Sequence, residues 1–87
     1  ALRLFVSPNP SAGEVALRYS LPGAEAPAIR VYDVRGRMVC ALAAGEPLGL
    51  LVWDGTDAGG RSVAPGVYFV RLSGGEFSET TRITRVR

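Results

Sequence analysis

The chain has 87 residues, of which 47% are hydrophobic and 21% charged, and its formal net charge is +2. A chain this short forms one domain that buries about two thirds of its unfolded surface, which argues against a two-lobed active site. No apolar run approaches the roughly 20 residues that span a bilayer, and the start lacks the pattern of a signal peptide. Because the chain begins with Ala1 rather than Met, we interpret residues 1–87 as a processed product or as one module of a longer protein.

The residue types argue against catalysis. The chain contains no histidine, so the commonest general base and the usual zinc ligand are missing, and we expect neither a catalytic triad nor a zinc site. The one cysteine, Cys40, lies in an apolar segment and is interpreted as a small core residue. The acidic residues fall in or beside turns or at outward strand positions, where no apolar pocket would raise the pKa of an acid catalyst. We therefore expect a protein that is not an enzyme and needs no cofactor.

Hydrophobic and polar residues alternate with a period of two along most of the chain, which is typical of half-buried strands. The alternation is clear in segments 2–7, 15–21 and 29–32, and further strands are expected at 38–42, 50–53, 67–72 and 77–86. The fourth segment would equally suit a helical turn. Short strands separated by turns every 8 to 12 residues predict an all-β fold, an immunoglobulin-like β-sandwich of about seven antiparallel strands. A small closed barrel is the alternative, because strand number alone does not distinguish the two.

Proline and glycine mark the connections between these strands. The corner at 7–13 contains two prolines, which a central strand does not tolerate, and Leu21-Pro22-Gly23 ends the second strand in the same way. Gly36 is placed for a positive φ in a tight turn, and Gly74-Gly75 predicts a two-residue hairpin loop. The last two strands are therefore expected to be antiparallel neighbours.

The segment 53–60 is the most distinctive stretch of the sequence. Asp54, Thr56 or Asp57 and a carbonyl of the glycine turn could offer oxygen ligands to Ca²⁺. A calcium-binding EF-hand loop, however, needs a glutamate at its twelfth position, where Pro65 stands here. We therefore favour turns in which the aspartates accept backbone hydrogen bonds, with Gly59 or Gly60 at positive φ and no bound metal.

Trp53 is expected to be a large core residue rather than a platform for stacking sugars. Its predicted neighbours between the two sheets are Val15, Leu17, Ile29, Val31, Tyr68 and Val70.

The arginines are expected to lie singly on outward strand positions, namely Arg18, Arg30, Arg71, Arg82, Arg85 and Arg87. Without clustering or interleaved aromatic residues, and with a small net charge, they do not predict a nucleic-acid partner. The end of the chain differs from the other strands because Ile83 and Val86, three residues apart, do not point to the same core in a regular strand. It is either a bulged edge strand or a tail that another protein recognises.

Several motifs in order resemble the type A C-terminal sorting domains of the type IX secretion system, and also the related immunoglobulin-like domain of the flagellar hook-capping protein. The resemblance covers nearly all of the chain. The residues that carry it are Pro8, Asn9, Pro10, Tyr32, Asp33, Gly36, Trp53, Asp54, Gly55, Asp57, Gly60, Pro65, Gly66 and Tyr68, followed by a tail that ends Arg85-Val86-Arg87.

The resemblance implies a single non-catalytic module, residues 1–87, at the C-terminus of a larger secreted protein. Such a module directs the upstream cargo domain of the same chain through an outer-membrane translocon and its surface machinery. The protein would reach the surface or exterior of a Gram-negative bacterium by way of the periplasm, as a monomer. The resemblance also implies that a partner reads the tail, Arg82, Ile83, Thr84, Arg85, Val86 and Arg87, while residues 1–81 form the platform.

The alternative to a sorting module is a structural or carbohydrate-binding immunoglobulin-like module. A row of exposed aromatic residues on one face would favour that alternative. The residues that could supply the row are Phe5, Tyr32, Phe69 and Phe77.

Overall fold

The computed structural model describes residues 3–8, 10–21, 27–43, 46 and 48–86. These residues form seven strands, one for each expected segment. The strands are β1 (Arg3–Ser7), β2 (Val15–Ser20), β3 (Ala28–Asp33), β4 (Met38–Ala43), β5 (Leu48–Trp53), β6 (Gly66–Gly74) and β7 (Phe77–Arg85). The fourth segment is a strand and not a helical turn, because its backbone pairs with β3 and its Cys40 side chain is buried.

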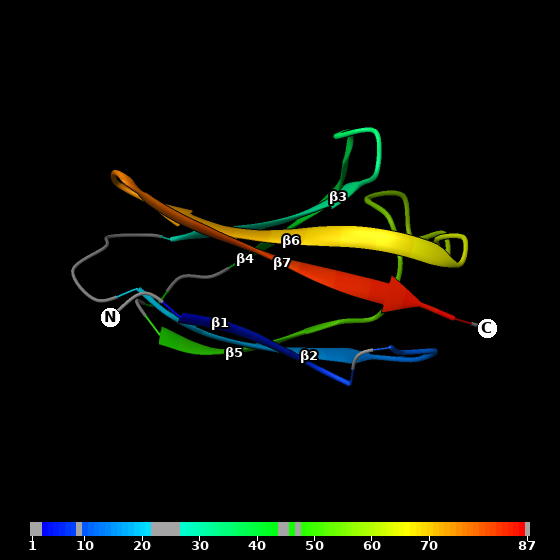
Figure 1. Cartoon of the computed structure of the whole chain (residues 1–87), viewed down its shortest axis with the longest axis horizontal. Helices are drawn as coiled ribbons and strands as arrows, with labels where there is room; N and C mark the ends of the chain where they lie inside the picture. Colours follow the sequence, from blue (N-terminus) through cyan, green and yellow to red (C-terminus); the bar gives the residue numbers. More distant parts are fainter. Residues whose placement is uncertain (1–2, 9, 22–26, 44–45, 47, 87) are drawn as a thin grey trace.

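The strands form two separate antiparallel sheets that face each other as two layers (Figure 1). One sheet has the order β1-β2-β5, and the other has the order β4-β3-β6-β7. This arrangement is an immunoglobulin-like β-sandwich and not a closed barrel, since among the described residues no strand of one sheet pairs with a strand of the other. The expected all-β sandwich of seven antiparallel strands is confirmed.

The core lies between the sheets, as alternation along each strand requires. Trp53 is 1% exposed, and all six neighbours that were expected around it are buried with it. The buried apolar side chains are Leu4, Val15, Leu17, Tyr19, Leu21, Ile29, Val31, Cys40, Trp53, Tyr68, Val70, Leu72 and Ile83. The core expected around Trp53 is therefore confirmed.

The corner between β1 and β2, which belong to one sheet, forms a bridge to the end of β7 in the opposite sheet. The Ser7–Pro8 peptide bond is cis, and Pro10 follows at an exposed position. The backbone N–H of Ser11 then donates to the carbonyl of Thr84 at 2.9 Å, and the N–H of Val86 donates to the carbonyl of Ser11 at 2.8 Å. The segment next to the first strand is thus bonded to the end of the last strand, in a parallel bridge.

The tight turns follow the glycines, with one shift in register. Gly36 has a φ of 82°, and the Asp33 carboxylate accepts hydrogen bonds from the N–H groups of Arg35 and Arg37. The β6–β7 hairpin forms as expected, but its two-residue loop is Gly75-Glu76, because Gly74 already pairs with Phe77. Gly75 supplies the positive φ, at 58°. The expectation of a Gly74-Gly75 loop was wrong by one residue, since either glycine could take that conformation. The turn residues Pro22 and Gly23, and Asn9 of the corner, lie outside the described residues.

Candidate functional site

The C-terminal residues continue the alternation of β7 instead of leaving the fold. Ile83 is fully buried and Arg85 is 8% exposed, whereas Val86 is 45% exposed. Arg82 is exposed and Thr84 is half-buried, on the opposite side of the strand from Ile83. Ile83 and Val86 therefore do not share the core, as expected, but the prediction that Arg85 points outward was wrong. The folded platform does not stop at residue 81, and Arg87 lies outside the described residues.

Arg85 closes one end of the sandwich. Its guanidinium lies over the ring of Trp53, with 5.2 Å between the guanidinium carbon and the ring centroid. Its Nη1 donates to the hydroxyl of Ser11 at 3.2 Å and to the carbonyl of Gly13. Nε is buried and has no hydrogen-bond partner among the residues that the structure describes. Because a buried guanidinium stays charged, the aromatic ring and the two oxygens must replace part of its lost hydration.

Gly55 lies directly against the guanidinium of Arg85. Its φ is 80°, a conformation that side chains with a Cβ rarely adopt. A Cβ at this position would overlap the Nη2 atom of Arg85. Gly55 therefore provides both a turn conformation and the space for the guanidinium. Sequence reasoning missed this pairing, because 30 residues separate the two positions and only the fold brings them together.

The loop after Trp53 is held by its own aspartates. The Asp54 carboxylate accepts hydrogen bonds from the N–H of Thr56 at 3.1 Å and from the Thr56 hydroxyl, which lowers the pKa of Asp54. The Asp57 carboxylate accepts from the N–H groups of Gly59 at 2.9 Å and Arg61 at 3.0 Å. Gly60 takes the positive φ, at 83°. The expected hydrogen-bonded turns are confirmed. No three potential metal-ligating side chains come together within the described ranges.

Tyr68 links the connection between β5 and β6 to the core through a hydrogen bond. Its hydroxyl donates to the carbonyl of Ala64 at 2.6 Å, just before Pro65 and Gly66, and burial raises its pKa. Its ring meets Trp53 edge to face, with the centroids 5.9 Å apart. A tyrosine bonded back to the chain at this corner is a known stabilising device of immunoglobulin-like sandwiches. Trp53, Tyr68 and Arg85 therefore pack together at one end of the molecule.

Cys40 lies on β4 with its side chain 7% exposed, and burial raises the pKa of its thiol. A thiol in this environment is mostly protonated at neutral pH and is a poor nucleophile. Cys40 therefore packs as a core residue, as the sequence indicated.

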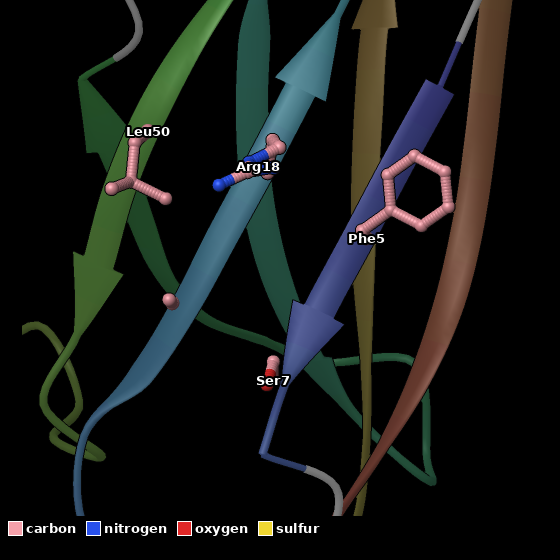
Figure 2. A pocket seen from close by; sticks show the side chains of 5 residues that line it. Phe5, Ser7, Arg18 and Leu50 are labelled. Atoms are coloured by element: carbon pink, nitrogen blue, oxygen red, sulfur yellow. The ribbon is translucent and has the colours of Figure 1, made fainter.

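The outer face of the β1-β2-β5 sheet is largely apolar. Phe5, Arg18 and Leu50 are partners across its three strands and line a shallow groove together with Ser7 and Ala16 (Figure 2). Leu48 and Val52, on the same edge strand as Leu50, are also more than half exposed. Figure 2 shows Phe5, Arg18 and Leu50 on adjacent strands of this sheet.

The aromatic residues considered for sugar binding do not form one row. Phe5 lies on the β1-β2-β5 sheet, whereas Tyr32 and Phe69 are partners on the other sheet. Both Tyr32 and Phe69 are half-buried, and Phe77 lies at the start of β7.

The arginines are not all isolated. Arg30 on β3 is the direct partner of Arg71 on β6. Arg82 on β7 is the partner of Phe69, which lies on β6 two residues before Arg71. The expectation that these three lie singly, without interleaved aromatic residues, was therefore wrong. Cross-strand register brings them together, and register is not visible in the spacing of residues along one strand.

A solved structure of PorZ has a similar fold. PorZ is an essential bacterial surface component of the type IX secretion system of the human oral bacterium Porphyromonas gingivalis. The match has a TM-score of 0.73 at 22% sequence identity and covers 97% of this chain, but the chain spans only 11% of the PorZ chain. At this identity the similarity shows a shared fold.

No family model and no curated protein matches the sequence. In the described part of the chain, no helix has the length and hydropathy required to cross a membrane.

Proposed function

We propose that this chain is a non-catalytic C-terminal sorting and surface-attachment module of the type IX secretion system. The observation that carries the proposal is the similarity, over 97% of the chain, to a domain-sized part of a surface component of that system. The ordered motifs that resemble type IX sorting domains support the same assignment. In this proposal the module needs no cofactor, acts as a monomer, and carries an upstream cargo domain through the periplasm to the cell surface.

The outward side of the tail is the part that a translocon would read. Arg82 and Val86 are exposed, and Thr84 lies between them on the same side of the chain as Arg82. β7 is an edge strand of its sheet, but Ser11 already bonds to the main chain of Thr84 and Val86. A partner would therefore recognise the outward side chains of the tail, or pair with the main chain of β7 before residue 84. The inward residues hold the tail in position, because Ile83 is part of the core and Arg85 lies over the ring of Trp53.

The test should alter the outward residues without disturbing the core. Deleting residues 82–87 would also remove Ile83 and Arg85, so loss of sorting could simply reflect unfolding. The double variant Arg82→Glu/Val86→Glu changes only exposed tail positions. Its matched control, Arg18→Glu/Leu50→Glu, changes one exposed arginine and one exposed aliphatic residue on the other sheet.

Each variant is fused to a cargo enzyme and expressed in a bacterium that has the type IX system. We expect the tail variant to leave active cargo in the periplasm, while the wild type and the control variant deliver it to the surface. Thermal melts of the purified domains verify that all three are folded. If cargo fused to the folded tail variant still reaches the surface, the tail is not the sorting signal. The chain is then instead a structural or carbohydrate-binding appended module.

A further inference from the structure

On the outer face of the β4-β3-β6-β7 sheet, the strand positions that the structure describes include three arginines and no acidic residue. Its outward positions in the described strands are Ala28, Arg30, Tyr32, Met38, Ala41, Ala43, Val67, Phe69, Arg71, Ser73, Ser78, Thr80, Arg82 and Thr84. The two acidic residues on these strands, Asp33 and Glu79, occupy inward positions opposite Tyr68 and Leu72. Glu79 also accepts a hydrogen bond from the N–H of Leu4 on the facing sheet.

Arg30 and Arg71 are placed unfavourably for a free protein. They are direct partners on adjacent antiparallel strands, where Cβ atoms are about 4.5–5.5 Å apart and like charges repel. Both are exposed, and neither guanidinium has a hydrogen bond or ion pair with any residue that the structure describes. A carboxylate between them would replace the repulsion by two charge-assisted hydrogen-bonding interactions.

The surroundings of this pair suit a protein partner. Tyr32 and Phe69 are partners in the next row of the face, and Arg82 lies beside Phe69 on β7. Arginine and aromatic side chains are enriched where protein interfaces derive most of their binding energy. The remaining outward positions near Arg30 and Arg71 are mostly small, such as Ala41 and Thr80, so a flat surface could approach closely.

We propose that this face, defined by Arg30, Arg71, Arg82, Tyr32 and Phe69 and here called the basic face, binds a carboxylate-rich protein surface. The inference rests on the proposed function, and it specifies the chemistry of one protein partner that the module would bind. A second copy of the chain is disfavoured in a symmetric contact, because Arg30 and Arg71 would meet the same charges. Nucleic acid and glycan are less suited, since Tyr32 and Phe69 are half-buried and offer little ring surface for stacking.

The experiment uses the 87-residue chain alone, labelled with ¹⁵N, and titrates it at low salt with a synthetic deca-glutamate peptide. Amide shift changes should centre on Arg30, Phe69 and Arg71. The variant Arg30→Gln/Arg71→Gln should bind about tenfold more weakly, since charged pairs at an interface contribute on this scale. The control Arg18→Gln/Arg61→Gln, which loses the same charge from exposed positions elsewhere, should stay within about twofold of wild type.

Equal weakening in the two double variants would overturn the inference, because only net charge would then matter. Polygalacturonate and a single-stranded DNA oligonucleotide are titrated in parallel. Tighter binding of either one through Arg30 and Arg71 would show that the partner class is wrong.

A third variant separates binding from folding. Arg71→Glu places an opposite charge beside Arg30, so it should raise the melting temperature and abolish peptide binding. A variant that melts no higher, or that still binds the peptide, contradicts the inference. All these measurements are made without the secretion system. Failure of the cargo assay therefore counts against the proposed function, whereas failure of the peptide titration with Arg30 and Arg71 counts against the basic face alone and leaves the tail as a sorting signal.

Discussion

The inward and outward sides of β7 differ sharply in burial near the end of the strand. On the inward side, Ile83 is fully buried and Arg85 packs against Trp53. On the outward side, Arg82 is exposed, as is Val86 beyond the end of the strand. Because successive strand residues point to opposite faces, one short segment can both complete a core and present side chains to a partner. The difference teaches that substitutions, and not truncation, are needed to separate the two roles.

The largest effect is expected from removing the residue on which the inward side packs. Trp53→Ala should lower the free energy of unfolding by about 3–5 kcal/mol, as other large-to-small core changes do. Urea denaturation gives the value. Tryptophan fluorescence of the wild type provides a check, because a readily quenched, solvent-exposed tryptophan in the native protein would contradict its burial.

The two aliphatic residues of the tail should respond very differently to the same kind of change. Ile83→Ala should cost about 2–5 kcal/mol, because it leaves a cavity in the core. Val86→Ala should stay within about 0.5 kcal/mol, because its side chain is exposed. Urea denaturation of both variants tests the contrast directly. Similar costs would mean that the tail is not divided into an inward and an outward side.

The contact between Gly55 and Arg85 should appear as an energetic coupling. Gly55→Ala strains a positive φ and also displaces the guanidinium, whereas in an Arg85→Ala background only the strain remains. A double-mutant cycle should therefore give a coupling of about 1–2 kcal/mol, within the range found for contacting residues. Additive effects of the two substitutions would exclude a tight fit between them.

Acidification should weaken the turn that follows Trp53. The hydrogen bond from the Thr56 hydroxyl holds the pKa of Asp54 below its ordinary value of 3.8. The stabilisation is therefore fully present above that ordinary value, and is lost as the pH falls from there through the lowered pKa. Thermal melts between pH 2 and 7 should show the advantage of wild type over Asp54→Asn shrinking in this acid range. An advantage that does not change with pH would contradict the assignment.

The smallest expected effect is that of calcium. The carboxylates of Asp54 and Asp57 already accept hydrogen bonds within the turn, so millimolar Ca²⁺ or a chelator should leave the melting temperature unchanged. A real site at 100-fold saturation would add about 2.7 kcal/mol to the stability. A shift of several degrees would show that the loop binds metal.

Local chemistry made much of this fold predictable from the sequence. Alternation and short apolar runs located the strand segments, although 38–42 equally suited a helical turn. Asp54, Asp57 and Gly36 predicted their turns correctly, because these signals depend on neighbours a few residues away. The β6–β7 loop was predicted with a shift of one residue, since Gly74 and Gly75 are equally able to take a positive φ.

The features that depend on residues far apart in the chain were decided only by the tertiary structure. Arg85 was expected on the surface because charged residues usually lie there, yet Trp53, Ser11 and Gly55 together make an enclosed place for its guanidinium. Arg30 and Arg71 lie 41 positions apart and become partners only through the register of β3 and β6. By itself the sequence determined where the strand segments lie and where most of the turns fall, whereas the pairing with β3 made residues 38–43 a strand. The packing of the two sheets decided which arginine is buried and which arginines meet, because strand register and enclosure arise from contacts between segments far apart in the chain.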